Sequence, residues 1–193
     1  MLQQALDKLV QLIDEAGSLN IPDARTAALS TCGNNKQPSV RIINIQKVSI
    51  EGLVFFANRN SGKVIQLDQN PNAGLCFYWP GLGEQVIVDG VVERQSGEVS
   101  DKHWSKRSRD QQVVAWSSEQ GTPAESAIST KEKAKAVRSD SGFSPLNRHP
   151  DWDAYYLRPS RIEFWHTSGR RANQRVLYRV GAAGEWEKEL INP

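Results

Sequence analysis

The sequence predicts one domain, residues 1–193, that is mainly β with helices (α+β), its strands forming an antiparallel barrel or sandwich. Three observations support this fold class. Nine short segments have strand character, most of them are joined by short turns, and helical periodicity is confined to the start and the middle of the chain. Strands at hairpin spacing favour antiparallel pairing over βαβ units. A chain of 193 residues buries enough surface to fold without disulfides.

In the first half, apolar residues recur at helical spacing over residues 2–16, and Gly17 offers a C-cap. Gly33 with Asn34-Asn35 predicts a hairpin between the first two strands. Ser61 is a suitable N-cap for a short helix through Leu67. The strands expected here are Thr26–Thr31, Val40–Val48, Leu53–Ala57, Ala73–Trp79 and Glu84–Arg94.

In the second half, the period changes towards that of a helix from Ser100 to Glu119. Residues 121–150 are polar and weakly patterned, and we expect a helix over Ala124–Val137 followed by a loop. Gly181 and Gly184 mark the last hairpin. The closing strands are expected at Ala154–Leu157, Arg161–His166, Arg175–Val180 and Glu185–Leu190.

Composition excludes several classes of protein. The 24 basic and 22 acidic residues leave a net charge of only +2, which disfavours a nucleic-acid-binding role. No run of about 18 uncharged apolar residues predicts a membrane span. Charges interrupt the N-terminus before a signal-peptide core can form, so we expect a cytoplasmic protein. Three scattered histidines predict no metal site. Any bound anion therefore requires a local cluster of basic residues.

One such cluster is Ser61-Gly62-Lys63, at a turn from a strand into a helix. Backbone N–H groups at a helix N-terminus favour an anion, Gly62 allows close approach, and Lys63 adds charge. The alternative is an ordinary N-capped turn with a solvated lysine. Two further groups of basic residues are candidates for anion binding, and the alternative for each is an ordinary solvated face. They are Lys106, Arg107 and Arg109, and Arg170, Arg171 and Arg175 beside Trp165.

Several blocks, in order and at similar spacing from about Asp23 to the end, resemble the pyridoxine (pyridoxamine) 5'-phosphate oxidases. The blocks are Arg41–Ile45, Gly52–Lys63, Asn70-Pro71, Glu84–Gly90, Arg107–Gln111 with Ala115-Trp116 and Gln120, Ile162–Trp165 with Arg171 and Arg175, and Leu190–Pro193. The resemblance implies a Greek-key-like split β-barrel that binds FMN at the interface of a homodimer.

The same resemblance implies which residues hold the cofactor. Arg41 and Lys63 correspond to contacts of the FMN phosphate, a dianion that favours charge-assisted bonds, with Ser61 in the same loop. Some of the other contacts would come from the second subunit. The full set is Arg41, Ile42, Phe56, Ala57, Ser61, Gly62, Lys63, Gln85, Gln120, Trp165 and Arg175. Phe56-Ala57 replaces a Tyr-Thr pair of the family, and Gly62 replaces an arginine.

The substrate half departs further from the family. Gln46 replaces a lysine, His103 a tyrosine and Gln111 a serine, and Asn173 replaces the histidine of an Arg-x-His motif. Only Arg107 and Arg171 match. Each lost charge-assisted bond to a substrate phosphate is worth about 1.5–3 kcal/mol. The expected pocket, for a small polar or anionic substrate, is Gln46, His103, Arg107, Gln111, Arg171 and Asn173.

Three functions follow from this pattern. The first is an FMN-dependent oxidase whose substrate is not pyridoxamine phosphate, with Arg171 and His103 placing the substrate and flavin N5 accepting a hydride before reoxidation by oxygen. No general base is assigned. The second is a genuine pyridoxamine/pyridoxine 5'-phosphate oxidase of vitamin B6 metabolism. The third is an FMN-binding carrier or sensor without turnover.

Overall fold

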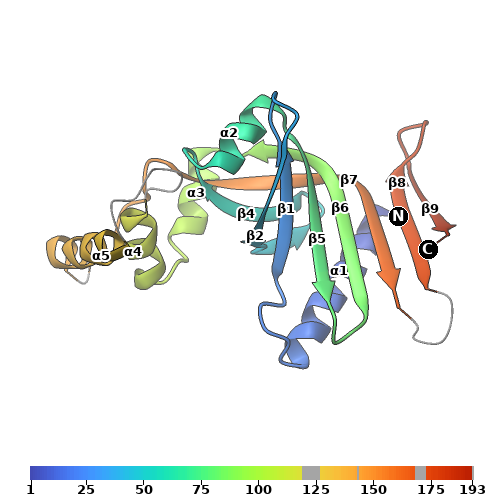
Figure 1. The fold of residues 1–193 in the computed structure, drawn as a ribbon, viewed down its shortest axis with the longest axis horizontal. Helices are drawn as coiled ribbons and strands as arrows, with labels where there is room; N and C mark the ends of the chain where they lie inside the picture. The colour runs from blue at the N-terminus through green and yellow to red at the C-terminus, as the bar shows by residue number, and fades with distance from the viewer. Residues whose placement is uncertain (119–126, 143, 168–172, 193) are drawn as a thin grey trace. The chain divides into compact units, whose positions relative to one another are not determined.

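The computed structural model describes residues 1–118, 127–142, 144–167 and 173–192 (Figure 1). The helices are α1 (Leu2–Ser18), α2 (Gly62–Gln69), α3 (Gly97–Trp104), α4 (Arg109–Ser117) and α5 (Ala127–Ser141). The strands are β1 (Thr26–Cys32), β2 (Pro38–Asn44), β3 (Lys47–Ser49), β4 (Gly52–Asn58), β5 (Asn72–Trp79), β6 (Glu84–Arg94), β7 (Trp152–His166), β8 (Gln174–Val180) and β9 (Trp186–Ile191).

The chain divides into two compact units. The first unit comprises Met1–Phe55, Gln66–Glu93 and Tyr156–Pro193, and the second comprises Phe56–Ile65 and Arg94–Tyr155. The expectation of a single domain therefore stays a prediction.

The first unit contains most of a mainly antiparallel sheet that curls into a half-barrel. The strand order is β2-β1-β5-β6-β7-β4-β3, and β8 pairs with both β7 and β9. The predicted hairpin between the first two strands is confirmed, since β1 and β2 pair antiparallel from Thr26↔Asn44 to Cys32↔Pro38. In β6 alternate residues, including Val86 and Val88, are buried, as expected of a strand with one face in the core.

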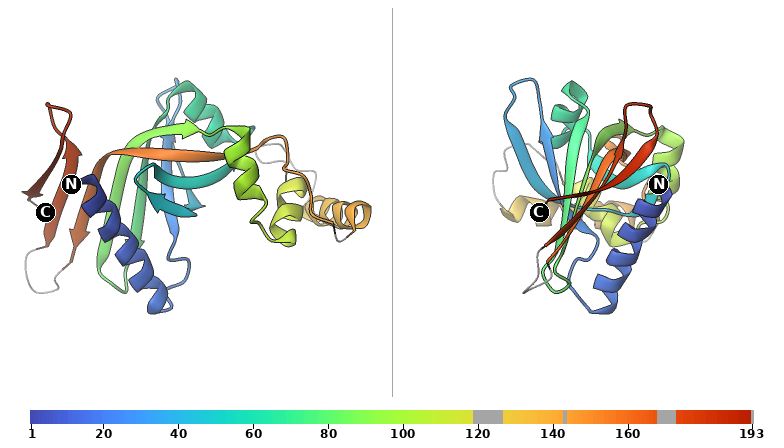
Figure 2. Two further views of the ribbon diagram at one scale, coloured as in Figure 1. Left: turned by 180° about the vertical axis from the view of Figure 1, so that it is seen from behind. Right: turned by 90° about the vertical axis from the view of Figure 1, so that its right-hand side faces the viewer.

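Helix α1 lies along one side of the sheet of the first unit (Figures 1 and 2), and its apolar stripe is buried. The stripe follows the 3- and 4-residue spacing that predicted the helix. Its buried residues are Ala5, Leu6, Leu9, Leu12, Ile13 and Ala16. The helix runs two residues beyond the predicted end, and the Ile21 N–H then donates to the Ala16 carbonyl at 3.0 Å.

Two strand predictions were wrong in extent. Val40–Val48 is not one strand, because the chain leaves β1 after Asn44 and the Gln46 N–H donates to the Val54 carbonyl at 2.8 Å. The two strands expected at Ala154–Leu157 and Arg161–His166 are the single strand β7. Here β7 passes so close to β6 that a Cβ on Gly90 would lie 2.0 Å from the Arg158 carbonyl oxygen.

In the second unit, the single helix expected over Ser100–Glu119 is wrong. Two helices occur, α3 and α4, because Ser108 starts a new helix with a capping box. The Ser108 hydroxyl accepts from the Gln111 N–H, and the Gln111 side chain accepts from the Ser108 N–H. The helix expected over Ala124–Val137 corresponds to α5, which continues four residues beyond Val137; residues 124–126 lie outside the described part of the chain.

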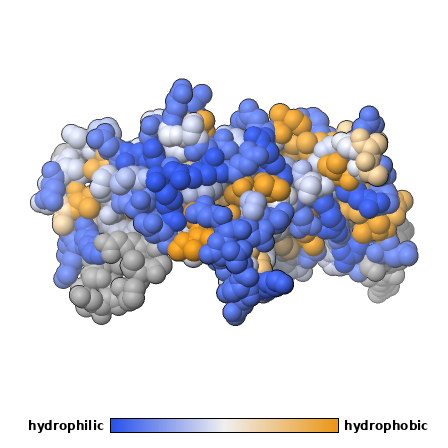
Figure 3. Space-filling view, turned by 90° about the horizontal axis from the view of Figure 1, so that it is seen from above, coloured by the Kyte–Doolittle hydropathy of each residue, from blue (hydrophilic) through white to orange (hydrophobic). Residues whose placement is uncertain are grey.

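The molecular face shown in Figure 3 carries its apolar residues in small groups among hydrophilic ones. Scattered apolar residues of this kind are normal for a protein surface. Among the described helices, none combines the length and apolar character needed to span a bilayer.

Candidate functional site

The predicted phosphate-binding turn, Ser61-Gly62-Lys63, lies in the second unit at the N-terminus of α2. The Ser61 carbonyl accepts the first hydrogen bonds of the helix, from the N–H groups of Val64 and Ile65. Lys63 Nζ donates to Ser61 Oγ at 3.1 Å, while Ser61 Oγ donates to the Asn58 carbonyl at 2.7 Å. No atom of the described residues lies within 4 Å of the position that a Cβ on Gly62 would take. The turn therefore combines a cation, a hydroxyl, a helix N-terminus and open space, which suits a phosphate.

Arg41 lies on β2 of the first unit, with its guanidinium among polar partners. Its Nη1 donates to Thr31 Oγ1 at 2.6 Å and to the Leu29 carbonyl at 3.2 Å, and its Nη2 donates to Gln66 Oε1 at 3.4 Å. Desolvation by burial lowers the pKa of Arg41 from its ordinary value. Ile42 alternates to the other face of β2, where it is 69% exposed.

Three further predicted cofactor residues also lie in the first unit. Gln85 is on β6, and Trp165 on β7 stands opposite Arg175 on β8. The Arg175 guanidinium donates to Glu163, a buried carboxylate that also accepts from Arg161. Sequence reasoning missed Glu163 as the partner of Arg175, although the alternation of β7 and β8 places both side chains near each other.

Two of the predicted substrate residues belong to an aromatic cluster in the second unit. The Phe56 ring lies 4.4 Å from the Trp152 ring and 5.2 Å from the His103 ring, between centroids. The Arg107 guanidinium stacks over Trp152 at 5.0 Å and over Trp104 at 5.8 Å. His103 and Arg107 are thus brought into one cluster, which could pack a planar ring.

Arg107 is a partly buried cation. Its Nη2 donates to the Gln111 carbonyl at 3.2 Å, and its buried Nε has no hydrogen-bond partner among the described residues. Desolvation lowers the pKa of Arg107 from its ordinary value. A guanidinium that is only partly buried in an aromatic surrounding favours binding of an anionic group through those of its N–H groups that face solvent.

Gln111 and Gln46 are engaged locally. The Gln111 side chain belongs to the capping box of α4, and Gln46 Nε2 donates to Asn44 Oδ1 at 2.6 Å. Asn173 directly precedes β8 and is partly exposed. Arg171 and Gln120 lie outside the described residues, so their roles stay predictions.

The two units divide the predicted cofactor set. The first unit carries Arg41, Ile42, Gln85, Trp165 and Arg175, and the second carries Phe56, Ala57, Ser61, Gly62 and Lys63. Ala57 is buried beside Phe56 on β4.

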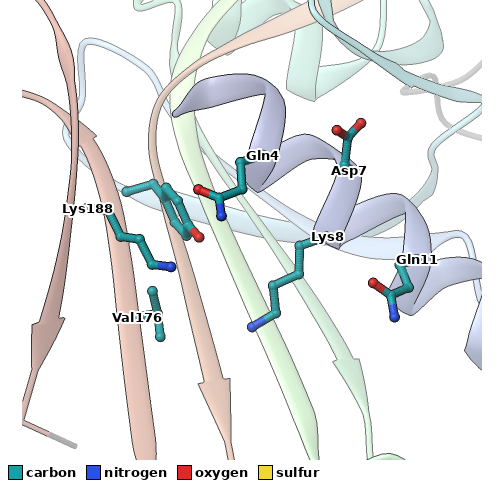
Figure 4. A pocket seen from close by; sticks show the side chains of 7 residues that line it. Gln4, Asp7, Lys8, Gln11, Val176 and Lys188 are labelled. Carbon is teal, nitrogen blue, oxygen red and sulfur yellow. The ribbon is translucent and has the colours of Figure 1, made fainter.

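A separate pocket lies between α1 and the β8–β9 hairpin in the first unit (Figure 4). Lys8 from α1 and Lys188 from β9 project into it, beside Gln4, Gln11 and Val176. None of the predicted site residues that the structure describes lines this pocket.

Two family models match the chain. Residues 13–139 match "Pyridoxamine 5'-phosphate oxidase", and residues 152–193 match "Pyridoxine 5'-phosphate oxidase C-terminal dimerisation region". A pyridoxine/pyridoxamine 5'-phosphate oxidase of Burkholderia ambifaria is 36% identical over 181 residues, which cover 93% of this chain and 84% of that protein. One of Alkalilimnicola ehrlichii is 33% identical over 100% of this chain and 99% of its own length.

Solved structures share the fold. PhzG from Burkholderia lata, in complex with tetrahydrophenazine-1-carboxylic acid, has a TM-score of 0.90 at 23% identity, covering 97% of this chain and 91% of its own. A pyridoxamine 5'-phosphate oxidase-related, FMN binding protein from Nostoc punctiforme has a TM-score of 0.74 at 22% identity, covering 90% and 91%. The expected split β-barrel is confirmed.

Proposed function

Because the chain belongs to the pyridoxamine 5'-phosphate oxidase family, we propose that it is an FMN-dependent oxidoreductase acting on a small polar or anionic substrate. When bound, FMN supplies a ring whose N5 accepts a hydride and which oxygen reoxidises. The protein's own residues bind the phosphate, orient the ring and hold the substrate. The observation that carries the proposal is the Lys63–Ser61 pair at the N-terminus of α2.

The residues of this turn fit the phosphate of FMN. The buried Ser61 hydroxyl is already oriented by the Asn58 carbonyl, and Lys63 Nζ stands next to it. Charge-assisted bonds of this kind are about twice as strong as neutral ones. Arg41 supplies a second cation in this proposal, and Gln85, Trp165 and Arg175 are further contacts.

The substrate that we propose is not pyridoxamine phosphate. Gln111 uses its side chain to cap α4, so it is a poor replacement for a hydroxyl that holds a substrate phosphate. The Arg107 guanidinium stacks on Trp152 and is only partly buried, which suits one anionic group of a planar molecule. His103 and Arg171 would place this substrate.

A genuine pyridoxine/pyridoxamine 5'-phosphate oxidase is the second candidate. It is favoured by relatives of that name that are 33–36% identical over nearly the whole chain. The third candidate, an FMN carrier or sensor without turnover, is distinguished by the same experiment.

We also propose that the chain forms a homodimer. The register of the first unit places one row of apolar side chains across four strands of the sheet, and none of them is buried. The row is Ile42, Ala28, Cys76 and Ile87. Val40, which neighbours this row, is 67% exposed. An exposed apolar sheet face of this kind suits a protein interface, and the match to a dimerisation region supports it.

Anaerobic reduction of the flavoprotein tests these candidates. The FMN-loaded protein is mixed with pyridoxine 5'-phosphate, pyridoxamine 5'-phosphate or a panel of planar carboxylates, and bleaching of the flavin absorbance is followed. We expect reduction by a member of the panel and slow reduction by both phosphates. Rapid reduction by either phosphate would establish the second candidate, and a flavin that no compound reduces would favour the carrier.

A further inference from the structure

Asp153 of the second unit is a buried carboxylate surrounded by three arginines. Its side chain is 2% exposed. Asp153 Oδ2 accepts from Arg59 Nε at 3.1 Å and lies 2.7 Å from Arg94 Nε, and Oδ1 accepts from Arg148 Nη1 at 2.9 Å. A buried charge with this many donors is well compensated and holds its partners in place.

Arg59 joins this carboxylate to the turn that precedes α2. Besides its bond to Asp153, its Nη2 donates to the Pro150 carbonyl at 2.5 Å, and its backbone N–H donates to the Asp151 carbonyl at 2.7 Å. Asn60 Nδ2 donates to Asp151 Oδ2 at 2.9 Å. Residues 59 and 60 are therefore fastened to the segment 150–153 by side chains and backbone.

Arg59 and Asn60, which are bonded to the segment 150–153, directly precede Ser61 in the chain. The Asn60 N–H donates to Asn58 Oδ1 at 2.8 Å, and the Ser61 N–H donates to the Asn58 carbonyl at 3.1 Å. The chain between residues 58 and 61 is thus closed on itself and anchored from outside by Arg59. A turn held in this way loses less conformational freedom when a ligand binds.

We infer that Asp153, acting through Arg59, is a positioning residue that holds the Ser61–Lys63 turn in the geometry needed for a phosphate. The inference rests on the proposed function, since it assumes that this turn binds the FMN phosphate. In this inference neither side chain contacts the ligand, because Arg59 is bonded to Asp153 and to the Pro150 carbonyl, and both act on the backbone from which Ser61 and Lys63 project.

The test compares FMN with riboflavin, which has the same ring and no phosphate. Dissociation constants for both are measured by flavin fluorescence for the wild-type protein, Arg59→Met and Arg94→Met. Arg94 is the matched control because it contacts the same Asp153 oxygen and is similarly exposed, at 45% against 37% for Arg59, but belongs to β6.

We expect Arg59→Met to weaken the binding of FMN by about tenfold, which corresponds to about 1.4 kcal/mol, and to leave the affinity for riboflavin unchanged. Arg94→Met is expected to keep the wild-type ratio of the two constants. Asp153→Asn should reproduce the effect of Arg59→Met; if that variant does not fold, Arg59→Met decides.

Two results overturn the inference alone. The first is a dissociation constant for FMN in Arg59→Met that equals the wild-type value. The second is an equal loss of affinity for FMN and riboflavin, which indicates a merely structural role. A wild-type protein that binds no FMN contradicts the proposed function as well, so the two failures are distinguished.

Discussion

At the scale of single residues, two charged side chains of the predicted binding sites are partly buried, and burial shifts their pKa values. Arg41 and Arg107 are cations whose pKa is lowered by burial, and both belong to predicted binding sites. Perturbed groups of this kind are typical of functional sites. The side chain of Glu84 is also poorly exposed, at 13%, and it is not one of the predicted site residues.

The raised pKa of Glu84 predicts that the stability of the protein depends on pH. Desolvation by burial raises the pKa of Glu84, and the nearby Glu15 raises it further. The positive charges of His166 and Lys8 lower this pKa, but the net shift is upward. Its Oε1 lies 3.0 Å from His166 Nδ1, and Lys8 in turn faces Lys188. Because the folded state binds the proton more tightly than the unfolded state does, this group's contribution to stability is present at low pH. It is lost as pH rises above the ordinary glutamate value.

Glu84→Gln removes this titration. We expect the variant to gain stability relative to the wild type as pH rises from about 4 to about 7. Urea unfolding at both pH values measures the difference. Asp68→Asn, at an exposed position of α2, is the control and should show no such trend. A wild-type advantage that grows with pH would contradict the assignment.

At the scale of elements, local patterns predicted most of the fold. The bounds of β6 and the start of α1 follow from strict alternation and helical periodicity. The full length of β7 did not follow from its local pattern, because Pro159 interrupts that pattern. The strand stays continuous because it pairs with strands that are distant in the sequence. The break between α3 and α4 had a signal in the sequence, the capping box of Ser108 and Gln111, but the helical period runs on across it and suggested one helix.

The same contrast holds for the candidate site. The Ser61–Lys63 turn was predictable, since its residues are adjacent in the sequence. The Arg59–Asp153 pair was not, since its members are 94 positions apart and only the fold brings them together.

Gln111 yields a prediction for α4. Gln111→Ala removes half of the capping box, and we expect a loss of about 1 kcal/mol in the free energy of unfolding. Ser108→Ala should cost a similar amount, and the double variant less than the sum because the bonds belong to one motif. Thermal unfolding measures both. Since the side chain caps the helix, KM for the physiological substrate should be unchanged in Gln111→Ala; a large rise in KM would return Gln111 to the substrate pocket.

At the scale of the whole molecule, the proposed homodimer depends on the exposed apolar face of the sheet. Ile42→Lys places a charge at the β2 end of this face, where Ile42 is 69% exposed in one chain. We expect the variant to sediment as a monomer with an unchanged far-ultraviolet circular dichroism spectrum, because the side chain makes no contribution to the core. Val114→Lys, on α4 and 60% exposed, is the control and should remain a dimer. Dimeric Ile42→Lys would exclude this face as the interface.

We propose that the chain holds FMN by its phosphate, through Lys63 and Arg41. Equilibrium titration of FMN into the purified wild-type protein and into the double variant Arg41→Ala/Lys63→Ala tests it most directly. We predict that the wild-type protein binds one FMN per chain and that the double variant, although folded, retains none after gel filtration, since charge-assisted bonds to the dianion are lost. A wild-type protein that does not bind FMN, or a double variant that binds FMN as tightly as the wild type does, would exclude this mode of binding.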